Sequence, residues 1–264
     1  MARAKTELEN FLVYGVDEKN RKVYFGSNTL YAEEESGTVT QTSCDSAIRA
    51  IERMATDHPK TPIELHMNSY GGDPYAMLAL YDIIQSTSCQ IKFFGKGAVM
   101  SAATWIMVGC DERNLYPHST VMVHNGNDGY LGNVTDFNIY KEEGDRLMNV
   151  LYEIYEENTR MDKKFWQEIC KRDLFLSAEE AVTLGLADKI IRPRKRGNLR
   201  KSREYHLSQD IDKKRINKLT NKLMKRIHAD TKIEVNVKEY KPEPIDERLT
   251  IEPIKKDEEE NNNV

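Results

Sequence analysis

The stretch GKGAVMSAATWIMVG, residues 95–109, joins a glycine-rich strand end to the start of an apolar helix. We expect a strand over residues 90–95 and a helix over residues 101–109. The helix is apolar nearly all round, which is typical of a helix buried in a protein core. Ser101 stands where this helix begins, so the core would hold the serine rigidly at a strand-to-helix turn.

Two interpretations of Ser101 are open. A serine at the start of a helix is most often an N-cap, whose hydroxyl accepts a hydrogen bond from a backbone N–H. The alternative is a nucleophile, because the helix N-terminus offers N–H groups and the positive end of a dipole to developing negative charge. Small side chains around the serine leave room for a substrate: Ala98, Ala102 and Ala103. We follow the nucleophile interpretation.

A second strand-to-helix turn lies in MNSYGGDP, residues 67–74. It follows an alternating strand at residues 63–67 and precedes a helix over residues 74–86. Adjacent glycines allow backbone conformations closed to other residues and let the main chain approach a ligand. In the functional interpretation, the N–H groups of Gly72 and Ala102 form an oxyanion hole. Otherwise, the motif is an ordinary turn between a strand and a helix.

A base and a carboxylate complete the candidate catalytic set. A hydroxyl nucleophile is weak at neutral pH and needs a base within hydrogen-bond reach. Of the six histidines, only His124 ends a strand, at residues 121–124, beside a glycine-rich loop at residues 125–129. Asp173 precedes an apolar pair in a loop and would hold the imidazole in the right tautomer. Taken alone, each of these two side chains is more often structural.

The rest of the body alternates strands and helices, which is the signature of an α/β fold. We expect a strand over residues 22–25, helices over residues 46–55, 135–158 and 162–170, and a last helix and strand within residues 175–191. This pattern divides the chain into three parts: an N-terminal segment (1–20), a globular domain (21–191) and a C-terminal extension (192–264).

Charge separates the extension from the body. Residues 1–191 hold 19 Lys and Arg against 29 Asp and Glu, whereas residues 192–264 hold 20 against 14, so the net charges are −10 and +6. The extension carries one Lys-rich amphipathic helix over residues 211–227, and its acidic, Asn-rich end is typical of disorder. It is either a solvated, partly disordered extension with one surface helix, or an element that binds nucleic acid, a capsid scaffold or another partner. The second interpretation is open because clustered cations attract polyanions.

Cysteine usage and hydropathy indicate the compartment. The four cysteines lie far apart without metal-ligand spacing, which predicts small buried thiols in a reducing environment. The N-terminus lacks the apolar run of a signal peptide, and the longest apolar stretch, residues 98–108, is too short to span a bilayer. We therefore expect a cytoplasmic protein with no membrane segment, no metal and no cofactor.

Four motifs together resemble the proteolytic subunit of the Clp protease, a family with the ClpP/crotonase fold. They are, in order, MNSYGG (67–72), GAVMSAAT (97–104), Pro117 with VMVH (121–124), and RDLFLSAEEAVTLGLAD (172–188). The resemblance covers residues from about 22 to 191, with Tyr70 standing where the family has a proline. It implies a serine endopeptidase with a catalytic triad of Ser101, His124 and Asp173.

The resemblance also implies a fold and an assembly. The fold would be an α/β spiral of β-β-α units with a long protruding handle helix from Thr135, which would interlock two seven-subunit rings into a tetradecameric chamber. Degradation of polypeptide substrates would use an AAA+ unfoldase as ATPase partner. Substrate would add as a strand beside the loop that follows His124. The implied substrate-binding residues are Gly71, Asn125, Gly126, Asn127, Asp128 and Gly129.

Three alternatives to this function are open. SAAT (101–104), followed by GCDER (109–113), also resembles phage relatives of the family, some of which are head-maturation proteases. A crotonase-type acyl-CoA enzyme shares the fold but does not need all three triad side chains. An inactive structural ring subunit would carry a misaligned triad.

Overall fold

Repeated strand–strand–helix units build the first half of the protein. The computed structural model describes residues 7, 10–25, 37–126, 132–191 and 213–227. The first unit is β2 (Lys22–Phe25), β3 (Thr38–Val39) and α2 (Gln41–Asp57), and the second is β4 (Ile63–Ser69), β5 (Gly71–Gly72) and α3 (Pro74–Ser86). The predicted α/β fold with β-β-α units is therefore confirmed.

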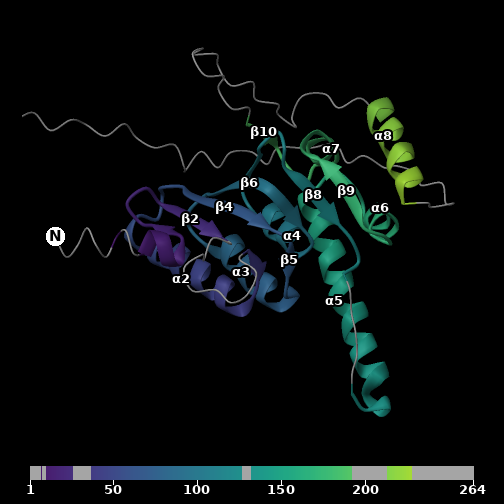
Figure 1. Cartoon of the computed structure of the whole chain (residues 1–264), viewed down its shortest axis with the longest axis horizontal. Coiled ribbons are helices and arrows are strands. Elements are labelled where there is room, and N and C mark those ends of the chain that lie inside the picture. The colour runs from purple at the N-terminus through teal and green to yellow at the C-terminus, as the bar shows by residue number, and fades with distance from the viewer. Residues whose placement is uncertain (1–6, 8–9, 26–36, 127–131, 192–212, 228–264) are drawn as a thin grey trace, which may run out of the picture.

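One eight-stranded sheet forms the centre of the molecule (Figure 1). Its strand order is β1–β2–β4–β6–β7–β10, and β8 and β9 branch off beside β6. The remaining strands are β1 (Val16–Asp17), β6 (Ile91–Met100), β7 (Glu112–Leu115), β8 (Thr120–Val123), β9 (Leu174–Ser177) and β10 (Lys189–Ile190). All pairs in this sheet are parallel except β1–β2 and β8–β9.

The long strand β6 is where the sheet divides. Its first half pairs with β7 through residues 92–95, and its second half pairs with β8 through residues 98–100. The predicted end of this strand at Gly95 is therefore wrong. Gly95 does not break the strand but makes room in it, since a Cβ there would lie 2.5 Å from a methyl group of Leu115. The strand thus runs up to the residue before Ser101.

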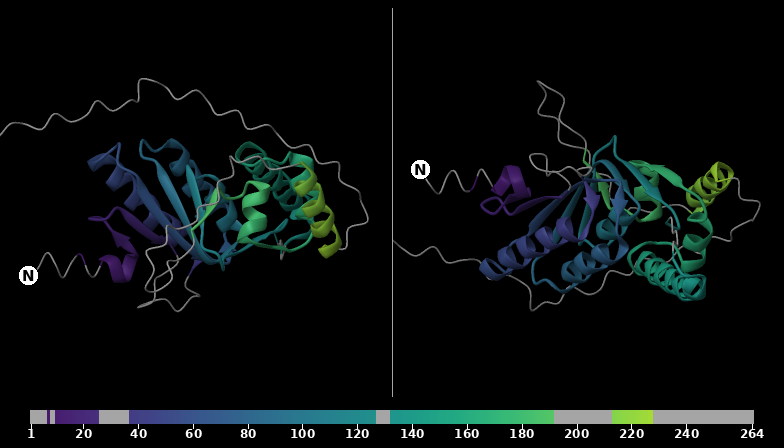
Figure 2. Two further views of the ribbon diagram at one scale, coloured as in Figure 1. Left: turned by 90° about the horizontal axis from the view of Figure 1, so that it is seen from above. Right: turned by 60° about the horizontal axis from the view of Figure 1, so that its bottom comes forward.

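Helices cover the sheet and extend beyond it. Figures 1 and 2 show α2 and α3 side by side against one side of the sheet. The helix α5, near the predicted 135–158, projects from the body in Figure 1. The remaining helices are α4 (Ala102–Val108), a 3₁₀ turn η1 (Val134–Asp136), α5 (Phe137–Asn158), α6 (Lys163–Ile169), α7 (Ala178–Leu184) and α8 (Lys213–Arg226).

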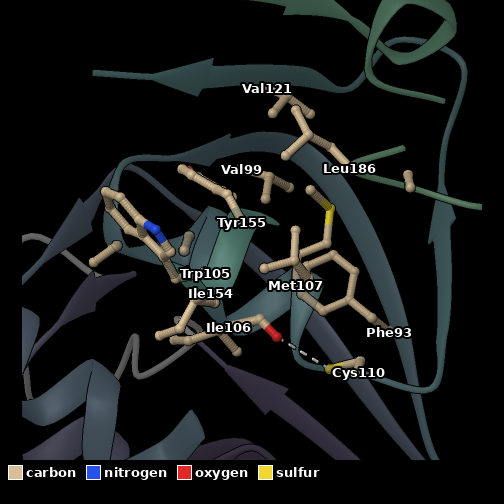
Figure 3. Close-up of a cluster of buried hydrophobic side chains, with 14 of the residues drawn as sticks. Phe93, Val99, Trp105, Ile106, Met107, Cys110, Val121, Ile154, Tyr155 and Leu186 are labelled. Carbon is tan, nitrogen blue, oxygen red and sulfur yellow. Dashed lines mark hydrogen bonds between the residues drawn. The ribbon is translucent and has the colours of Figure 1, made fainter. Parts of the chain in front are cut away.

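The predicted apolar helix, α4, lies in the middle of the core. It begins at Ala102 rather than at Ser101, and all seven of its residues are buried. Trp105 and Tyr155, both labelled in Figure 3, stack with ring centroids 5.0 Å apart. The indole N–H of Trp105 donates to the carbonyl of Leu151 at 3.0 Å. The C-terminal half of α5 therefore packs against α4, and this contact holds α4 in place.

Two further differences from the predicted element ends have a clear local cause. The helix predicted to start at Ser46 begins at Gln41, because Thr40 and Ser43 form a capping box that the apolar spacing did not reveal. Leu174–Ser177 is a strand, and α7 follows it behind a second capping box of Ser177 and Glu180. An apolar run of four residues does not distinguish a strand from a helix by its period alone.

The cysteines behave as predicted. All four are buried and none forms a disulfide: Cys44, Cys89, Cys110 and Cys170. Burial raises the pKa of Cys44 to about 12, so this thiol stays protonated. No helix in the described ranges has both the length and the apolar character needed to cross a membrane.

Most of the predicted extension lies outside the described residues, including the acidic end that we expect to be disordered. The described part is α8, which overlaps the predicted helix over residues 211–227. Four apolar side chains and a threonine from α8 and the residue after it are buried: Ile216, Thr220, Leu223, Met224 and Ile227. One side of this helix is therefore packed against the domain, as in a surface helix.

We predict that the packing of α2 on the sheet contributes strongly to stability. Ile51 is fully buried, so Ile51→Ala should lower the free energy of unfolding by about 2–5 kcal/mol. Glu52→Ala, at an exposed neighbour in the same helix, should change it by less than about 0.5 kcal/mol. Urea denaturation followed by circular dichroism measures both variants, and equal effects would contradict this description of the core.

Candidate active site

Three loops carrying predicted site residues lie at one edge of the sheet. Gly71 and Gly72 follow β4, Ser101 follows β6, and His124 follows β8. These three strands are parallel, so their carboxyl ends point to the same edge, where open α/β sheets bind their ligands. The fold therefore brings together residues that are up to 53 positions apart in the sequence.

The antiparallel β8–β9 ribbon positions the base beside the carboxylate. Its last pair is Val123 opposite Leu174, so His124 and Asp173 stand opposite each other just beyond the paired residues. His124 Nδ1 lies 3.3 Å from Asp173 Oδ1. The register of this ribbon therefore determines the spacing between the imidazole and the carboxylate.

Ser101 occupies an unusual backbone conformation at the β6–α4 turn. Its φ is 50° and its ψ is −127°, a region that non-glycine residues rarely adopt. Its backbone N–H donates to the carbonyl of Met122 at 2.9 Å, which ties the turn to β8. Its Oγ lies 2.7 Å from His124 Nε2 and makes no N-cap hydrogen bond. The N-cap interpretation of this serine is therefore wrong.

Thr104 stabilises this turn, and the sequence did not single it out. Its backbone N–H and its hydroxyl both donate to the carbonyl of Ser101, at 2.8 and 2.7 Å. The same hydroxyl is hydrogen-bonded to the phenol of Tyr155 on α5, and burial raises the pKa of that phenol well above its usual range. The only signal in the sequence is a polar residue three positions after the serine, inside an otherwise apolar helix.

The glycine pair packs directly against the Ser101 turn. Gly71 has a φ of 100°, and a Cβ there would lie 2.6 Å from Ser101 Cβ and 2.9 Å from the amide nitrogen of Ala102. Gly72 has a φ of 151°, and a Cβ there would lie 2.1 Å from the carbonyl oxygen of Val39. Both positions therefore require glycine, for backbone conformation and for space.

The backbone nitrogen of Ala102 lies beside the same loop. Ala102 is the first residue of α4, so its N–H has no partner within the helix. Its nitrogen is close to Gly71, which belongs to the turn that carries the predicted donor Gly72. The two predicted oxyanion donors thus come from adjacent segments, one on each side of Gly71.

The predicted substrate loop is described only in part. The amide oxygen of Asn125 accepts a hydrogen bond from the phenol of Tyr152 at 2.7 Å, which ties the start of the loop to α5. Gly126 has a φ of 82° and open space around its α-carbon. The other three predicted residues lie outside the described residues: Asn127, Asp128 and Gly129.

The imidazole of His124 is shielded from solvent, whereas the carboxylate of Asp173 is exposed. The side chain of His124 is 10% exposed, whereas that of Asp173 is 59% exposed. A hydroxyl, an imidazole and a carboxylate in this order can pass a proton from the hydroxyl to the ring while the carboxylate orients the ring. Within the described ranges, no cluster of three or more His, Cys, Asp or Glu side chains could hold a metal ion.

A second buried histidine lies outside this site. His66, which the sequence left open, is stacked between Tyr24 and Phe94, and its Nε2 contacts Glu64 at 2.8 Å. Burial lowers the pKa of His66, although Glu64 opposes the shift. Successive side chains of a strand point to opposite faces of the sheet, so His66 lies on the other face of β4 from Leu65 and Met67. Its contacts are to Tyr24, Phe94 and Glu64, and it is not part of the Ser101 cluster.

Comparison with known proteins agrees with this geometry. A sequence model of the Clp protease family matches residues 22–194, well over half of the chain, and the match includes Ser101, His124 and Asp173. The ATP-dependent Clp protease proteolytic subunit of Deinococcus radiodurans is 29% identical over 149 residues, which cover 56% of this chain and 73% of that protein. The chain therefore belongs to the Clp protease family and is a ClpP-like peptidase.

Proposed function

We propose that the protein is a serine endopeptidase that cleaves polypeptides through an acyl-enzyme on Ser101. The observation that carries the proposal is the 2.7 Å contact between Ser101 Oγ and His124 Nε2, with Asp173 at 3.3 Å from the other ring nitrogen. A nucleophile next to a base that a third group orients is the arrangement that activates a hydroxyl at neutral pH.

The proposed reaction has two halves, formation of the acyl-enzyme and its hydrolysis, and the same groups act in both. His124 takes the Ser101 hydroxyl proton as Oγ attacks the peptide carbonyl, and the N–H groups of Gly72 and Ala102 hold the resulting oxyanion. The imidazolium then gives the proton to the leaving amine, which departs and leaves an acyl-enzyme. Water, deprotonated by His124, attacks the ester; the C–O bond to Oγ then breaks, His124 returns the proton to Oγ, and the second product leaves as a carboxylic acid. Asp173 holds the imidazole ring in the same orientation in both halves.

Substrate would bind through its backbone rather than through its side chains. The turn at Gly71 and the start of the loop at Asn125 lie on either side of the Ser101 turn in the sheet order β4–β6–β8. An extended peptide that lies between these two segments and pairs with their backbone as an added strand would be held by main-chain hydrogen bonds. We therefore propose broad sequence specificity, with residues 125–129 as the substrate-binding loop.

The two halves of α5 differ in burial, and this difference supports assembly into rings. Its C-terminal half packs in the core, but large apolar side chains around its N-terminal end are exposed: Val134, Phe137, Ile139 and Tyr140. Exposed apolar patches of this kind mark protein contacts. We propose a second copy of this chain as the occupant, in stacked rings that enclose a chamber. An AAA+ unfoldase and a cytoplasmic location remain part of the proposal.

The rival functions differ in what they require of Ser101. A head-maturation protease of the same family would use the same chemistry without an ATPase. A crotonase-type enzyme would not require Ser101, and a structural ring subunit would assemble without reacting. The contact between Ser101 and His124 favours the peptidase over the last two. Binding of nucleic acid or a capsid scaffold by the extension stays a prediction.

We predict that Ser101→Ala removes peptidase activity, by about 10⁶-fold in kcat, because the hydroxyl is the nucleophile. The variant should also lose labelling by a fluorophosphonate, while its fold and assembly stay unchanged. Ser86→Ala, at an exposed serine on α3, is the matched control and should behave as wild type. Active-site labelling during size-exclusion chromatography tests both, and full activity of Ser101→Ala would refute the assignment.

We predict that Gly71→Ala lowers the rate of Ser101 labelling by about 10²-fold without unfolding the chain. The added methyl group would collide with Ser101 Cβ and with the Ala102 amide, so the turn must shift by several tenths of an ångström or more. A misplacement of about 1 Å can reduce a rate by about 10²-fold. Tyr70→Ala, at the exposed neighbouring residue, serves as the control. A wild-type labelling rate in Gly71→Ala would contradict the close packing described here.

We predict that Ile139→Glu disrupts assembly, because it places a charge among the exposed apolar side chains at the N-terminal end of α5. Asn138→Glu introduces the same side chain at an exposed position on the side of the helix opposite Tyr140, and should leave the oligomer intact. Size-exclusion chromatography with light scattering measures the mass of each. If both variants keep the wild-type mass, the apolar N-terminal end of α5 is not the contact between copies.

A further inference from the structure

The helix α8 packs beside β9 and α7, the two elements that follow Asp173 in the sequence. It lies beyond residues 22–194, which the family model matches, yet it contacts α7. Figure 1 shows it beside β9 and α7. Its buried side includes Ile216 and Leu223, both fully buried, and Met224, 6% exposed. This helix is therefore packed against the domain through an apolar side.

A polar cluster joins α8 to both β9 and α7. The guanidinium of Arg226 donates to the backbone carbonyl of Phe175 at 3.1 Å and to both carboxylate oxygens of Glu180, at 3.0 and 3.2 Å. Lys222 Nζ lies 3.1 Å from the same carboxylate. Arg226 thus connects the strand, the following helix and α8 through one side chain.

Glu180 is well placed to hold these cations. Its side chain is only 12% exposed, and it also accepts the backbone N–H of Ser177 in the capping box of α7. Burial acts to raise the pKa of Glu180, but the Ser177 N–H, Arg226 and Lys222 outweigh burial and bring the pKa to about 2. The carboxylate is therefore ionised near neutral pH.

The acidic member of the candidate triad has little support of its own. Asp173 is 59% exposed, and among the described residues its carboxylate has no hydrogen-bond or ion-pair partner besides His124. Its position depends on the backbone of the strand that begins at Leu174. That strand lies at the edge of the sheet, paired only with β8 among the described strands.

We propose that α8 holds β9 and the start of α7 in place, with Arg226 as a positioning residue that keeps Asp173 within reach of His124. The bond to the Phe175 carbonyl lies two residues from Asp173 and would limit movement of the strand away from β8. The inference rests on the proposed serine peptidase, because Asp173 matters here only through His124. It assigns a role in catalysis to a segment outside the family match.

The test compares Arg226→Ala with Lys225→Ala, an exposed neighbour on the same helix. Arg226→Ala should lower kcat on a fluorogenic peptide and the rate of fluorophosphonate labelling by about 10-fold, with KM unchanged, as expected for a small misplacement of a catalytic group. Lys225→Ala should stay within about twofold of wild type, the range expected of a surface substitution. A wild-type kcat for Arg226→Ala would overturn the proposal.

A double-mutant cycle separates positioning of Asp173 from general stability. In the Asp173→Asn background, Arg226→Ala should change kcat by less than about twofold, because the group that Arg226 positions has already lost its role. An equal 10-fold loss in both backgrounds would show that α8 acts on the fold as a whole and would overturn the inference. Arg226→Gln, which keeps a donor toward the Phe175 carbonyl, enters the same cycle if Arg226→Ala does not fold.

Labelling of the wild-type chain separates this inference from the function on which it rests. If the wild type does not react with the fluorophosphonate, the serine peptidase itself is refuted. If the wild type reacts and Arg226→Ala reacts equally fast, only the role of α8 is refuted.

Discussion

The pairing register of β8 is the constraint on which the rest of the site depends. This strand pairs with β6 on one side, Met100 opposite Met122, and with β9 on the other, Val123 opposite Leu174. The first pairing brings the Ser101 turn to His124, and the second brings Asp173 to the same imidazole. A slip by one residue would turn every side chain of the strand to the other face, so a single strand sets both contacts of the base.

The strained conformation of Ser101 is maintained by its surroundings. A non-glycine residue in such a region costs on the order of 1–3 kcal/mol and persists only where neighbouring structure enforces it. Here the enforcement comes from three directions: the carbonyl of Met122 binds the Ser101 N–H, Thr104 binds its carbonyl, and Gly71 packs against its side chain. The buried helix α4 follows directly, so relaxing the turn would require moving the core.

Local sequence patterns predicted the α/β class, the long helix and the place of the candidate nucleophile Ser101 at a strand-to-helix turn, because such turns with small residues are local features. Asp173 could be proposed only from the combined motifs, since its neighbour across the ribbon is 49 positions away in the sequence. The extension of β6 past Gly95 and the strand that begins at Leu174 were missed because pairing partners, not local propensity, make these segments strands. Thr104 and the docking of α8 also depend on contacts between distant segments.

The exposure of Asp173 determines what this carboxylate can contribute. At a distance of 4 Å, two unit charges attract by about 1 kcal/mol in water but by about 4 kcal/mol near a protein surface of lower effective dielectric constant. A carboxylate that is 59% exposed is closer to the first case. Its effect on His124 therefore comes mainly from holding the ring orientation, which is a matter of geometry. This geometry depends on the backbone that carries Asp173. Contacts to β9 and to the start of α7 therefore affect the position of this carboxylate more than they would affect that of a buried acid, whose side chain is held by its own neighbours.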